Sequence, residues 1–451
     1  MNKFIILLVC LFCLSLSVIS AQLFNLFSFR VWISSVIIQF IAIFNIFSNK
    51  EPYSLFKIFF IFTLFFFGIA PLFQFYNNTQ IWYSRPLAES EYFFTNILII
   101  FIITLYLVMY RYFRFLRKHK REKINVIYPL SRNANKKKIL LIALSSLSFL
   151  LTFYSNGFNI VPMLIRGGDL VQSSVQSSNN SDGQIQWLIL ANFVRPIAMM
   201  SFLYYVVNSI KIKIDFVFLL LLCLAIITCF PSSLSRYAVA GFYIPFCLVL
   251  FKYMRRINVF SISLILGLLV VFPFLSLFRN YSKETELKFS NTFDMFLTGD
   301  FDSYQNFALI LSHDLITNGN QILGVVFFWV PRTLWNGKPI GSGAFIGEKL
   351  HFFFTNVSAN YFAEGYLNFG FLGIFLFLLA LAFFTAKIDS IYWNNNYESK
   401  NSYFKIIYMT ILGLLFFILR GDLLSSFAYT LGFISSGHFV YKLANLNIKN
   451  K

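Results

Sequence analysis

Residues 371–386 read FLGIFLFLLALAFFTA, an apolar run without a charged residue. A helix needs about 20 residues, most of them apolar, to cross the hydrocarbon core of a bilayer. Similar runs recur along the 451-residue chain, which is 58% hydrophobic and only 12% charged. Because only helices and closed barrels satisfy their backbone groups in lipid, runs this long and continuous indicate helices, about twelve of them. The sequence therefore predicts an all-α polytopic membrane protein with a single membrane domain, residues 1–451.

The expected spans lie near Phe4–Ile19, Val31–Phe47, Ile58–Phe75, Phe93–Tyr110, Ile139–Tyr154, Trp187–Val207, Phe216–Phe230, Tyr237–Tyr253, Phe260–Phe278, Phe371–Ala386, Ile406–Leu419 and Leu424–Tyr441. The first run has two interpretations, because it ends in small residues that signal peptidase accepts. It is either a retained helix or a cleaved signal segment.

Basic residues set the expected orientation. The connection 111–138 holds eleven lysines and arginines against one acidic residue, Glu122. Cytoplasmic loops of membrane proteins are enriched in such residues, so this loop should be cytoplasmic. Alternation then puts Lys50 and Lys57 on the same side, together with both termini. The loops 156–186 and 279–370 become periplasmic, and the net charge of +19 reads as a topology signal, with no nucleic-acid partner implied.

The segment before the opening run is the long polar passage of the chain. Residues 331–370 read PRTLWNGKPIGSGAFIGEKLHFFFTNVSANYFAEGYLNFG. They close the large loop 279–370, in which residues 289–316 mix apolar and acidic positions and predict short amphipathic helices. Residues 323–330 are apolar but too short to cross, which predicts a re-entrant or interfacial segment.

Arginines in or beside a membrane are costly, so they mark functional candidates. Arg195 lies inside an expected span, and four others lie at helix boundaries that all project to the outer side: Arg236, Arg279, Arg332 and Arg420. Arg166 lies in the outer segment MLIRGGD. A guanidinium fork binds phosphate or pyrophosphate bidentately, which predicts a lipid diphosphate as ligand. For each arginine taken alone, anchoring of a helix end explains the position equally well.

At this point the chain resembles the Wzy-type O-antigen or capsule repeat-unit polymerases. The resemblance rests on the number of spans, the large late outer loop and the segment SANYFAEGYLNFGFLG, residues 358–373. Arg332 and Gly343 also match the arginine, ten-residue gap, glycine spacing described for such loops. A second spacing of this kind from Arg166 is absent, because Ser177 stands at the glycine position.

The resemblance implies a glycosyltransferase at the periplasmic face of a bacterial inner membrane. It would move a growing glycan from undecaprenyl diphosphate to a sugar hydroxyl of another undecaprenyl-diphosphate-linked repeat unit, within membrane lipid. A separate chain-length regulator is the expected protein partner. No metal or cofactor is implied, and the chain carries no nucleotide fingerprint or metal-ligand spacing.

Within this hypothesis the polar residues receive roles. Glu364 is the expected acceptor-activating base, with His351 as its rival; a helix-start acid is the structural alternative for Glu364. The diphosphates are assigned to Arg236, Arg279 and Arg332, with Arg195, Lys338, Arg420 and Arg166 as further candidates. Sugar contacts are assigned to Tyr361, Tyr366, Trp335, Phe369, Asn360 and Asn368.

Other function classes stay open from sequence alone. A lipid-linked oligosaccharide flippase would also need a positive cavity, but it should place several charges deep within helices, where only Arg195 lies. An O-antigen ligase or a polyprenyl-linked glycosyltransferase would share a similar helical body. In the ligase reading, His351 would supply the expected histidine of the late outer loop.

Overall fold

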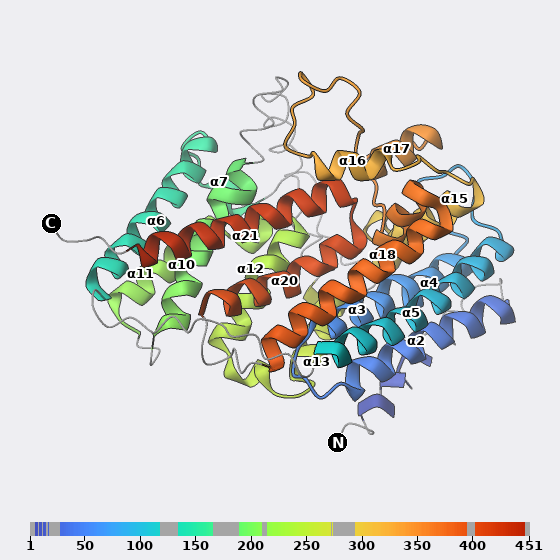
Figure 1. The fold of residues 1–451 in the computed structure, drawn as a ribbon, viewed down its shortest axis with the longest axis horizontal. Coiled ribbons are helices and arrows are strands. Elements are labelled where there is room, and N and C mark those ends of the chain that lie inside the picture. Colours follow the sequence, from blue (N-terminus) through green and yellow to red (C-terminus); the bar gives the residue numbers. More distant parts are fainter. Residues whose placement is uncertain are drawn as a thin grey trace.

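The structure, a computed structural model, describes residues 28–117, 134–165, 189–209, 214–271 with 273, 294–394 and 402–446, and parts of 5–17. Every regular element in these ranges is a helix, and eight helices are long and apolar enough to cross a membrane. Figure 1 shows long helices packed side by side, with short helices and loops around one end of the bundle. The protein is therefore a helical, polytopic membrane protein.

The first half of the chain forms α2 (Phe29–Ser48), α3 (Leu55–Phe62), η1 (Thr63–Ile69), α4 (Ala70–Tyr76), α5 (Glu89–Arg117), α6 (Ala134–Ser155), α7 (Val161–Leu164), η2 (Leu190–Val194) and α10 (Arg195–Asn208). It continues with α11 (Phe216–Thr228), η3 (Pro231–Ser233), α12 (Arg236–Leu250), η4 (Lys252–Arg255), α13 (Val259–Leu266) and η5 (Gly267–Val271). The last part forms η6 (Asp294–Leu297), η7 (Gly299–Phe301), α15 (Ser303–Ser312), α16 (Asn320–Val326), α17 (Ser342–Lys349), α18 (Tyr361–Asn394), α20 (Ser402–Arg420) and α21 (Leu423–Asn445).

Eight of the twelve expected spans correspond to the eight candidate spans. The expected spans near 237–253 and 260–278 coincide with the shorter apolar helices α12 and α13. The first expected span falls mostly on residues outside the described ranges, and the last coincides with α21, which has 23 residues. The connection 111–138 is helical up to Arg117 and again from Ala134, so α5 and α6 extend into it from both sides.

The start of α18 differs from the sequence expectation. The helix begins at Tyr361, ten residues before the expected span, so the end of the predicted loop 279–370 belongs to a helix. The two parts of α18 are separated at Phe369 and Gly370, where the backbone leaves the helical region. Gly370 has a φ of 61°, a left-handed conformation that glycine adopts without steric cost. The apolar pattern located the second part only.

The freed carbonyls at this break have partners. The backbone N–H of Thr317 donates to the carbonyl of Leu367 at 2.6 Å, and that of Gly319 donates to the carbonyl of Asn368 at 2.9 Å. Buried backbone groups need such partners, most of all in a membrane protein. The loop before α16 therefore holds the first part of α18 in place.

The expected amphipathic helices of 289–316 are present from residue 294 on as η6, η7 and α15, but α15 does not lie on the surface. Its residues Tyr304, Phe307 and Ile310 are fully buried, and it packs against α5 and α18. The expected re-entrant segment 323–330 overlaps the second half of α16, a helix of seven residues. The connection between α16 and α17 rises as a loop at the top of Figure 1.

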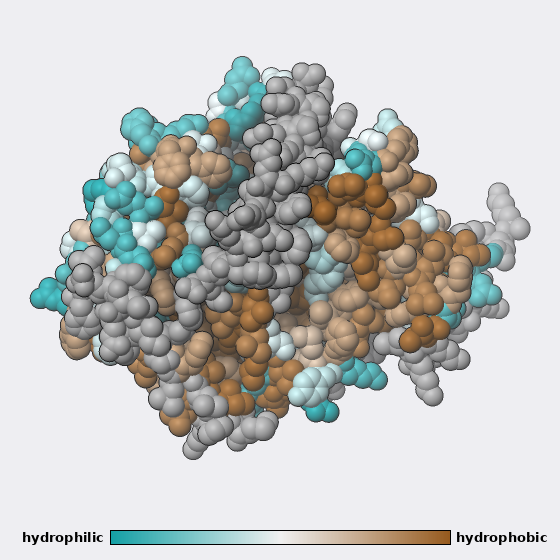
Figure 2. Space-filling view, turned by 180° about the vertical axis from the view of Figure 1, so that it is seen from behind, coloured by the Kyte–Doolittle hydropathy of each residue, from teal (hydrophilic) through white to brown (hydrophobic). Residues whose placement is uncertain are grey.

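Lys57 also differs from its expected place in a cytoplasmic connection. It lies in the first turn of α3 and is fully buried, with its Nζ 3.4 Å from Oδ1 of Asn258. The space-filling view in Figure 2 shows extensive hydrophobic surface on one face of the molecule. Exposed apolar side chains of this kind suit helices that face lipid.

Candidate functional site

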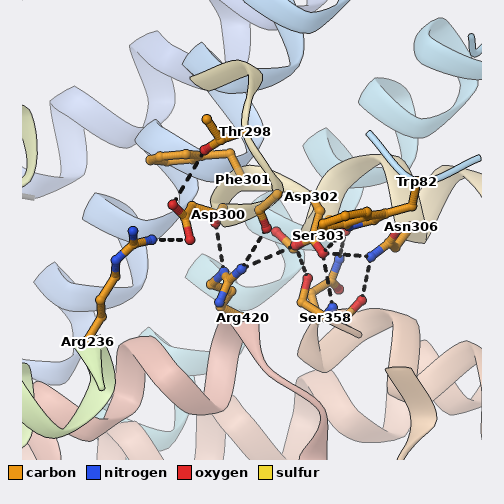
Figure 3. A network of polar contacts seen from close by, with 12 residues as sticks. Trp82, Arg236, Thr298, Asp300, Phe301, Asp302, Ser303, Asn306, Ser358 and Arg420 are labelled. Carbon is orange, nitrogen blue, oxygen red and sulfur yellow. Dashed lines mark hydrogen bonds and ion pairs between the residues drawn. The ribbon is translucent and has the colours of Figure 1, made fainter. Parts of the chain in front are cut away.

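Two arginines from different helices contact one segment of the chain, close to the turn between α20 and α21 (Figure 3). Arg236, the first residue of α12, forms an ion pair with Asp300. Arg420, the last residue of α20, donates from Nε to the backbone oxygen of Asp300 at 2.8 Å and from a terminal nitrogen to that of Gly299 at 3.0 Å. The side chains of Arg236 and Arg420 are 20% and 32% exposed. Arg236, Asp300, Asp302 and Arg420 are named the arginine cluster below.

Asp302 is the buried carboxylate of the arginine cluster, with 1% exposure. Its Oδ2 accepts the indole N–H of Trp82 at 2.8 Å and the backbone N–H of Ser358 at 3.1 Å. Its Oδ1 accepts the hydroxyl of Ser358 and lies 3.4 Å from the guanidinium of Arg420. Charge-assisted hydrogen bonds of this kind are the strong ones in proteins. Asp302 thus joins three segments that are far apart in the sequence.

Glu364 lies in the first turn of α18 and is fully buried. The hydroxyl of Ser342, the first residue of α17, donates to Oε2 at 2.8 Å, and the backbone N–H of Leu423 donates to Oε1 at 2.7 Å. The start of α18 is capped by Asn360, whose side-chain oxygen accepts the backbone N–H of Ala363 at 2.9 Å. The carboxylate of Glu364 is therefore enclosed between the starts of three helices.

The turn between α20 and α21 connects the arginine cluster to Glu364. Arg420 donates to the backbone oxygen of Asp300, and three residues later the backbone N–H of Leu423 donates to the carboxylate of Glu364. Asp422 between them caps α21, because its Oδ1 accepts the backbone N–H of Ser425 at 2.8 Å. Burial raises the pKa of the Asp422 carboxyl. Residues 420–423 thus contact two buried carboxylates, Asp302 through Arg420 and Glu364 through Leu423.

Gly343, part of the arginine-to-glycine spacing, lies in α17 where this helix meets the chain before α18. A Cβ at this position would lie 1.9 Å from the carbonyl oxygen of Val357. Only glycine allows the backbones to approach this closely. Gly343 therefore has a packing role that positions Ser342 beside Glu364.

Arg332 and Lys338 lie on the loop between α16 and α17, with their hydrogen bonds made inside this loop. Arg332 donates to the carbonyl of Lys338 at 2.7 Å and to that of Pro339 at 3.2 Å. The Nζ of Lys338 donates to the carbonyls of Phe328 at 2.7 Å and Val330 at 2.8 Å. Burial and the neighbouring Arg332 lower the pKa of Lys338. The structure thus binds these two cations to the backbone of their own loop.

Arg195 holds a different part of the chain. Its Nε donates to the carbonyl of Thr228 at the end of α11, and a terminal nitrogen donates to the hydroxyl of Ser233 in η3, both at 2.6 Å. It therefore supports the turn that leads into Arg236. Two other predicted arginines, Arg166 and Arg279, lie outside the described residues.

Three further predicted residues have these positions. His351 is exposed in the loop after α17, with a φ of 54°, and no hydrogen bond joins its ring to Glu364. The hydroxyl of Tyr366 donates to Asp314 at 2.6 Å. The side chain of Asn368 bridges the backbone N–H of Ile322 and the carbonyl of Glu364, both at 2.8 Å. Tyr366 and Asn368 thus connect α18 to the segment before it.

A second buried carboxylate, Asp389, lies near the other end of α18. It accepts the backbone N–H groups of Leu55 and Phe56 at 3.0 and 3.2 Å, and the hydroxyls of Tyr110 and Tyr408, each at 2.7 Å. These donors come from α3, α5 and α20. Since Asp389 has four donors and no exposure, its arrangement is typical of a structural junction.

Several of these partners could not be predicted from the sequence. Trp82, Asp300, Asp302 and Ser358 come from three separate regions, and their proximity depends on tertiary packing. One signal was available for Asp389: it follows an apolar run within the same helix, where a charged residue is rare and costly. Among the described residues, no group of three or more histidine, cysteine, aspartate or glutamate side chains is arranged to hold a metal ion.

The site is thus an arginine–carboxylate cluster at one end of a helical membrane protein. Comparison of the chain with protein-family models, curated proteins and solved structures gave no match.

Proposed function

We propose that the protein is a membrane glycosyltransferase that polymerises lipid-linked polysaccharide repeat units. It would transfer the growing glycan from undecaprenyl diphosphate to a sugar hydroxyl of a second undecaprenyl-diphosphate-linked repeat unit. The reaction would take place at the periplasmic face of a bacterial inner membrane, which the chain would cross about twelve times. The observation that carries this proposal is the approach of Arg236 and Arg420, from two helix ends, to one segment beside the enclosed Glu364. Cations beside a base are what this reaction requires.

The diphosphate is proposed to bind at the arginine cluster by exchange with Asp300. The side chains of Arg236 and Asp300 are 20% and 25% exposed, and an ion pair so close to solvent contributes about 0–1 kcal/mol. Charge-assisted hydrogen bonds between arginine and phosphate contribute about 1.5–3 kcal/mol each. A diphosphate can therefore displace Asp300 at low cost, whereas Asp302 stays in place because it is buried and has several donors.

Glu364 is proposed to take the proton of the acceptor hydroxyl. In the transfer, the acceptor oxygen forms a bond to the anomeric carbon while the bond from that carbon to the diphosphate oxygen breaks. The diphosphate leaves with the electron pair and is stabilised by the arginines. The hydroxyl of Ser342 now donates to Oε2 of Glu364, so the acceptor hydroxyl would take its position.

The central test uses the full-length chain reconstituted in phospholipid vesicles with lipid-linked repeat units. Glu364→Gln keeps the size of the side chain and should lower the rate of chain growth by about 100-fold or more. Glu348→Gln is the matched control, because Glu348 is exposed on the neighbouring α17. Normal chain growth by a correctly inserted Glu364→Gln protein would refute the assignment of the base.

The diphosphate site has its own test in the same assay. Arg236→Ala should raise the KM for the lipid-linked donor at least about tenfold, the equivalent of one lost charge-assisted bond. The control is Arg256→Ala, since Arg256 is exposed at the opposite end of α12. An unchanged KM for the Arg236→Ala protein would place the diphosphate elsewhere.

A gel of surface polysaccharide from cells lacking the gene separates the function classes. Single repeat units attached to the acceptor lipid are expected for loss of a polymerase. Complete absence of attached repeat units would instead favour a flippase or a ligase.

A further inference from the structure

Aromatic side chains gather beside the arginine cluster on the outside of the helices. The indole ring of Trp82 has its centroid 5.4 Å from the ring of Phe353 and 5.0 Å from that of Phe354. Phe353 is 79% exposed and Phe354 is 44% exposed, and both lie in the loop between α17 and α18. Large exposed aromatic rings that pack on one another usually mark a contact surface.

Trp82 is held firmly on its other side. Its indole N–H donates to Asp302 at 2.8 Å, and its ring lies so close to Gly299 that a Cβ there would be 2.2 Å from Cζ2 of the indole. Figure 3 shows Trp82 directed toward Asp302 and Arg420. The exposed rings are therefore connected through one rigid residue to the arginine cluster.

A second set of rings adjoins the first along the chain. The hydroxyl of Tyr83 lies 3.0 Å from Nε2 of His313, and the rings of Tyr83 and Phe352 are 6.0 Å apart. The guanidinium of Arg85 lies 5.7 Å from the centre of the Tyr83 ring and forms an ion pair with Glu91. Apolar ring faces thus alternate with polar groups.

The six residues Trp82, Tyr83, His313, Phe352, Phe353 and Phe354 are named the aromatic platform. We propose that the aromatic platform binds the glycan of the lipid-linked repeat unit, with sugar rings stacked on its exposed faces. This proposal rests on the proposed function, since it concerns the sugars attached to the diphosphate at the arginine cluster. It leaves out Tyr366, which the sequence suggested for sugar contacts, because Tyr366 is buried and hydrogen-bonded to Asp314.

The chemistry of the platform favours a sugar over a lipid chain. A pyranose has C–H faces that pack on aromatic rings and hydroxyls that need hydrogen-bond partners at the ring edges. The platform offers both, through its exposed phenylalanines and through the polar groups of Tyr83 and His313. The ion pair of Arg85 and Glu91 adds no net charge, which suits a neutral glycan. A lipid chain has no hydroxyls that could use the remaining hydrogen-bonding capacity of the Tyr83 hydroxyl.

The experiment measures binding of the free oligosaccharide repeat unit to the full-length chain in detergent. The probe is released by mild acid from the lipid-linked precursors of the host cell, and binding is followed by saturation-transfer NMR and isothermal titration. The double variant Phe353→Ala/Phe354→Ala should weaken binding by about tenfold, as expected for two lost ring contacts. Phe101→Ala is the control, since Phe101 is 61% exposed on the spanning helix α5 and should leave the affinity unchanged.

Each outcome decides the matter. No binding to the unaltered chain, or equal affinity for the double variant and the unaltered chain, would overturn the platform. Equal affinity together with weaker insertion into vesicles would mean that Phe353 and Phe354 are lipid anchors. Trp82→Phe, which keeps the ring and loses the bond to Asp302, should bind more weakly than the unaltered chain. The unaltered chain could also bind the glycan, and the double variant fail to bind it, while the unaltered chain has no polymerase activity. That result would support the platform and refute the proposed function.

Discussion

Asp300 and Asp389 are both ion-pairing or hydrogen-bonded carboxylates, but the protein holds them in opposite ways. Asp389 is fully buried and accepts four hydrogen bonds from three helices. Asp300 lies in the short helix η7, is 25% exposed and forms an ion pair with Arg236 at the start of α12. The first arrangement joins helices permanently, whereas the second leaves a partner that an anion can replace.

Glu364 and Asp302, whose partners include the turn between α20 and α21, are held in a way intermediate between Asp389 and Asp300. Each is buried, yet each accepts from segments outside the long helices, such as Ser342 and Ser358. A small shift of α17 or of the loop before α18 would therefore change their surroundings. The difference teaches that burial alone does not identify a functional acid; the elements that supply its donors must be known as well.

The largest effect is expected at Asp389. Asp389→Ala leaves four buried donors without an acceptor, which should lower the free energy of unfolding by about 3 kcal/mol or more. The measurement is thermal unfolding of the purified chain in detergent, with Asp389→Asn as the control that keeps one acceptor. A loss below about 1 kcal/mol for Asp389→Ala would mean that the junction does not stabilise the bundle.

A smaller effect should separate the two aspartates of the arginine cluster. Asp302→Ala should lower the free energy of unfolding by about 2 kcal/mol, because Trp82 and Ser358 lose their acceptor. Asp300→Ala should change it by less than about 1 kcal/mol, since the Arg236 pair is partly exposed. The same unfolding measurement compares the two variants. Equal decreases in the free energy of unfolding would contradict the proposal that a diphosphate displaces Asp300 from Arg236.

The smallest effect concerns pH. Burial raises the pKa of Asp422 in the folded chain, so the folded state holds its proton more tightly than the unfolded state does. This contribution to stability is present below the ordinary carboxyl range, near pH 4, and is lost as the pH rises through the raised pKa. Asp422→Asn keeps the cap of α21 and removes the titrating carboxyl. The free energy of unfolding at neutral pH should therefore rise by about 1 kcal/mol or less.

The pH prediction is checked by thermal unfolding of both chains from pH 4 to 7. The stability difference should shrink toward the acid end of this range. A difference that grows toward pH 4 would show that Asp422 is stabilised in its charged form.

Much of the fold could be predicted from hydrophobicity alone. Apolar runs located eight candidate spans, because lipid leaves only helices as a solution for a continuous apolar segment. Their boundaries were less certain where polar residues continue a helix, as at Tyr361, where α18 begins within the sequence SANYFAEG. Hydrophobicity carries no information about a helix start that is buried against other protein segments.

For the candidate site, the sequence indicated residue types but not their grouping. Arg236, Arg420 and Glu364 were predicted by type and boundary position. In the structure Arg236 and Arg420 both contact Asp300, and Glu364 contacts Leu423, three residues after Arg420. Arg332 and Lys338, predicted by the same reasoning, donate within their own loop. Lys57, predicted in a cytoplasmic connection, is buried beside Asn258. Boundary position therefore shows neither whether a charge is exposed nor which partner it contacts.

By itself the sequence determined that this chain is a helical membrane protein with arginines at helix ends and a polar segment before α18, since composition and the cost of burying charge in lipid decide those features. Only the tertiary structure decided which arginines share a segment, that Asp302 holds Trp82, and that Ser342 and Leu423 enclose Glu364. These contacts join residues that are 22 to 220 positions apart, a range over which local patterns carry no information. The packing of the helices alone brings them within hydrogen-bond distance.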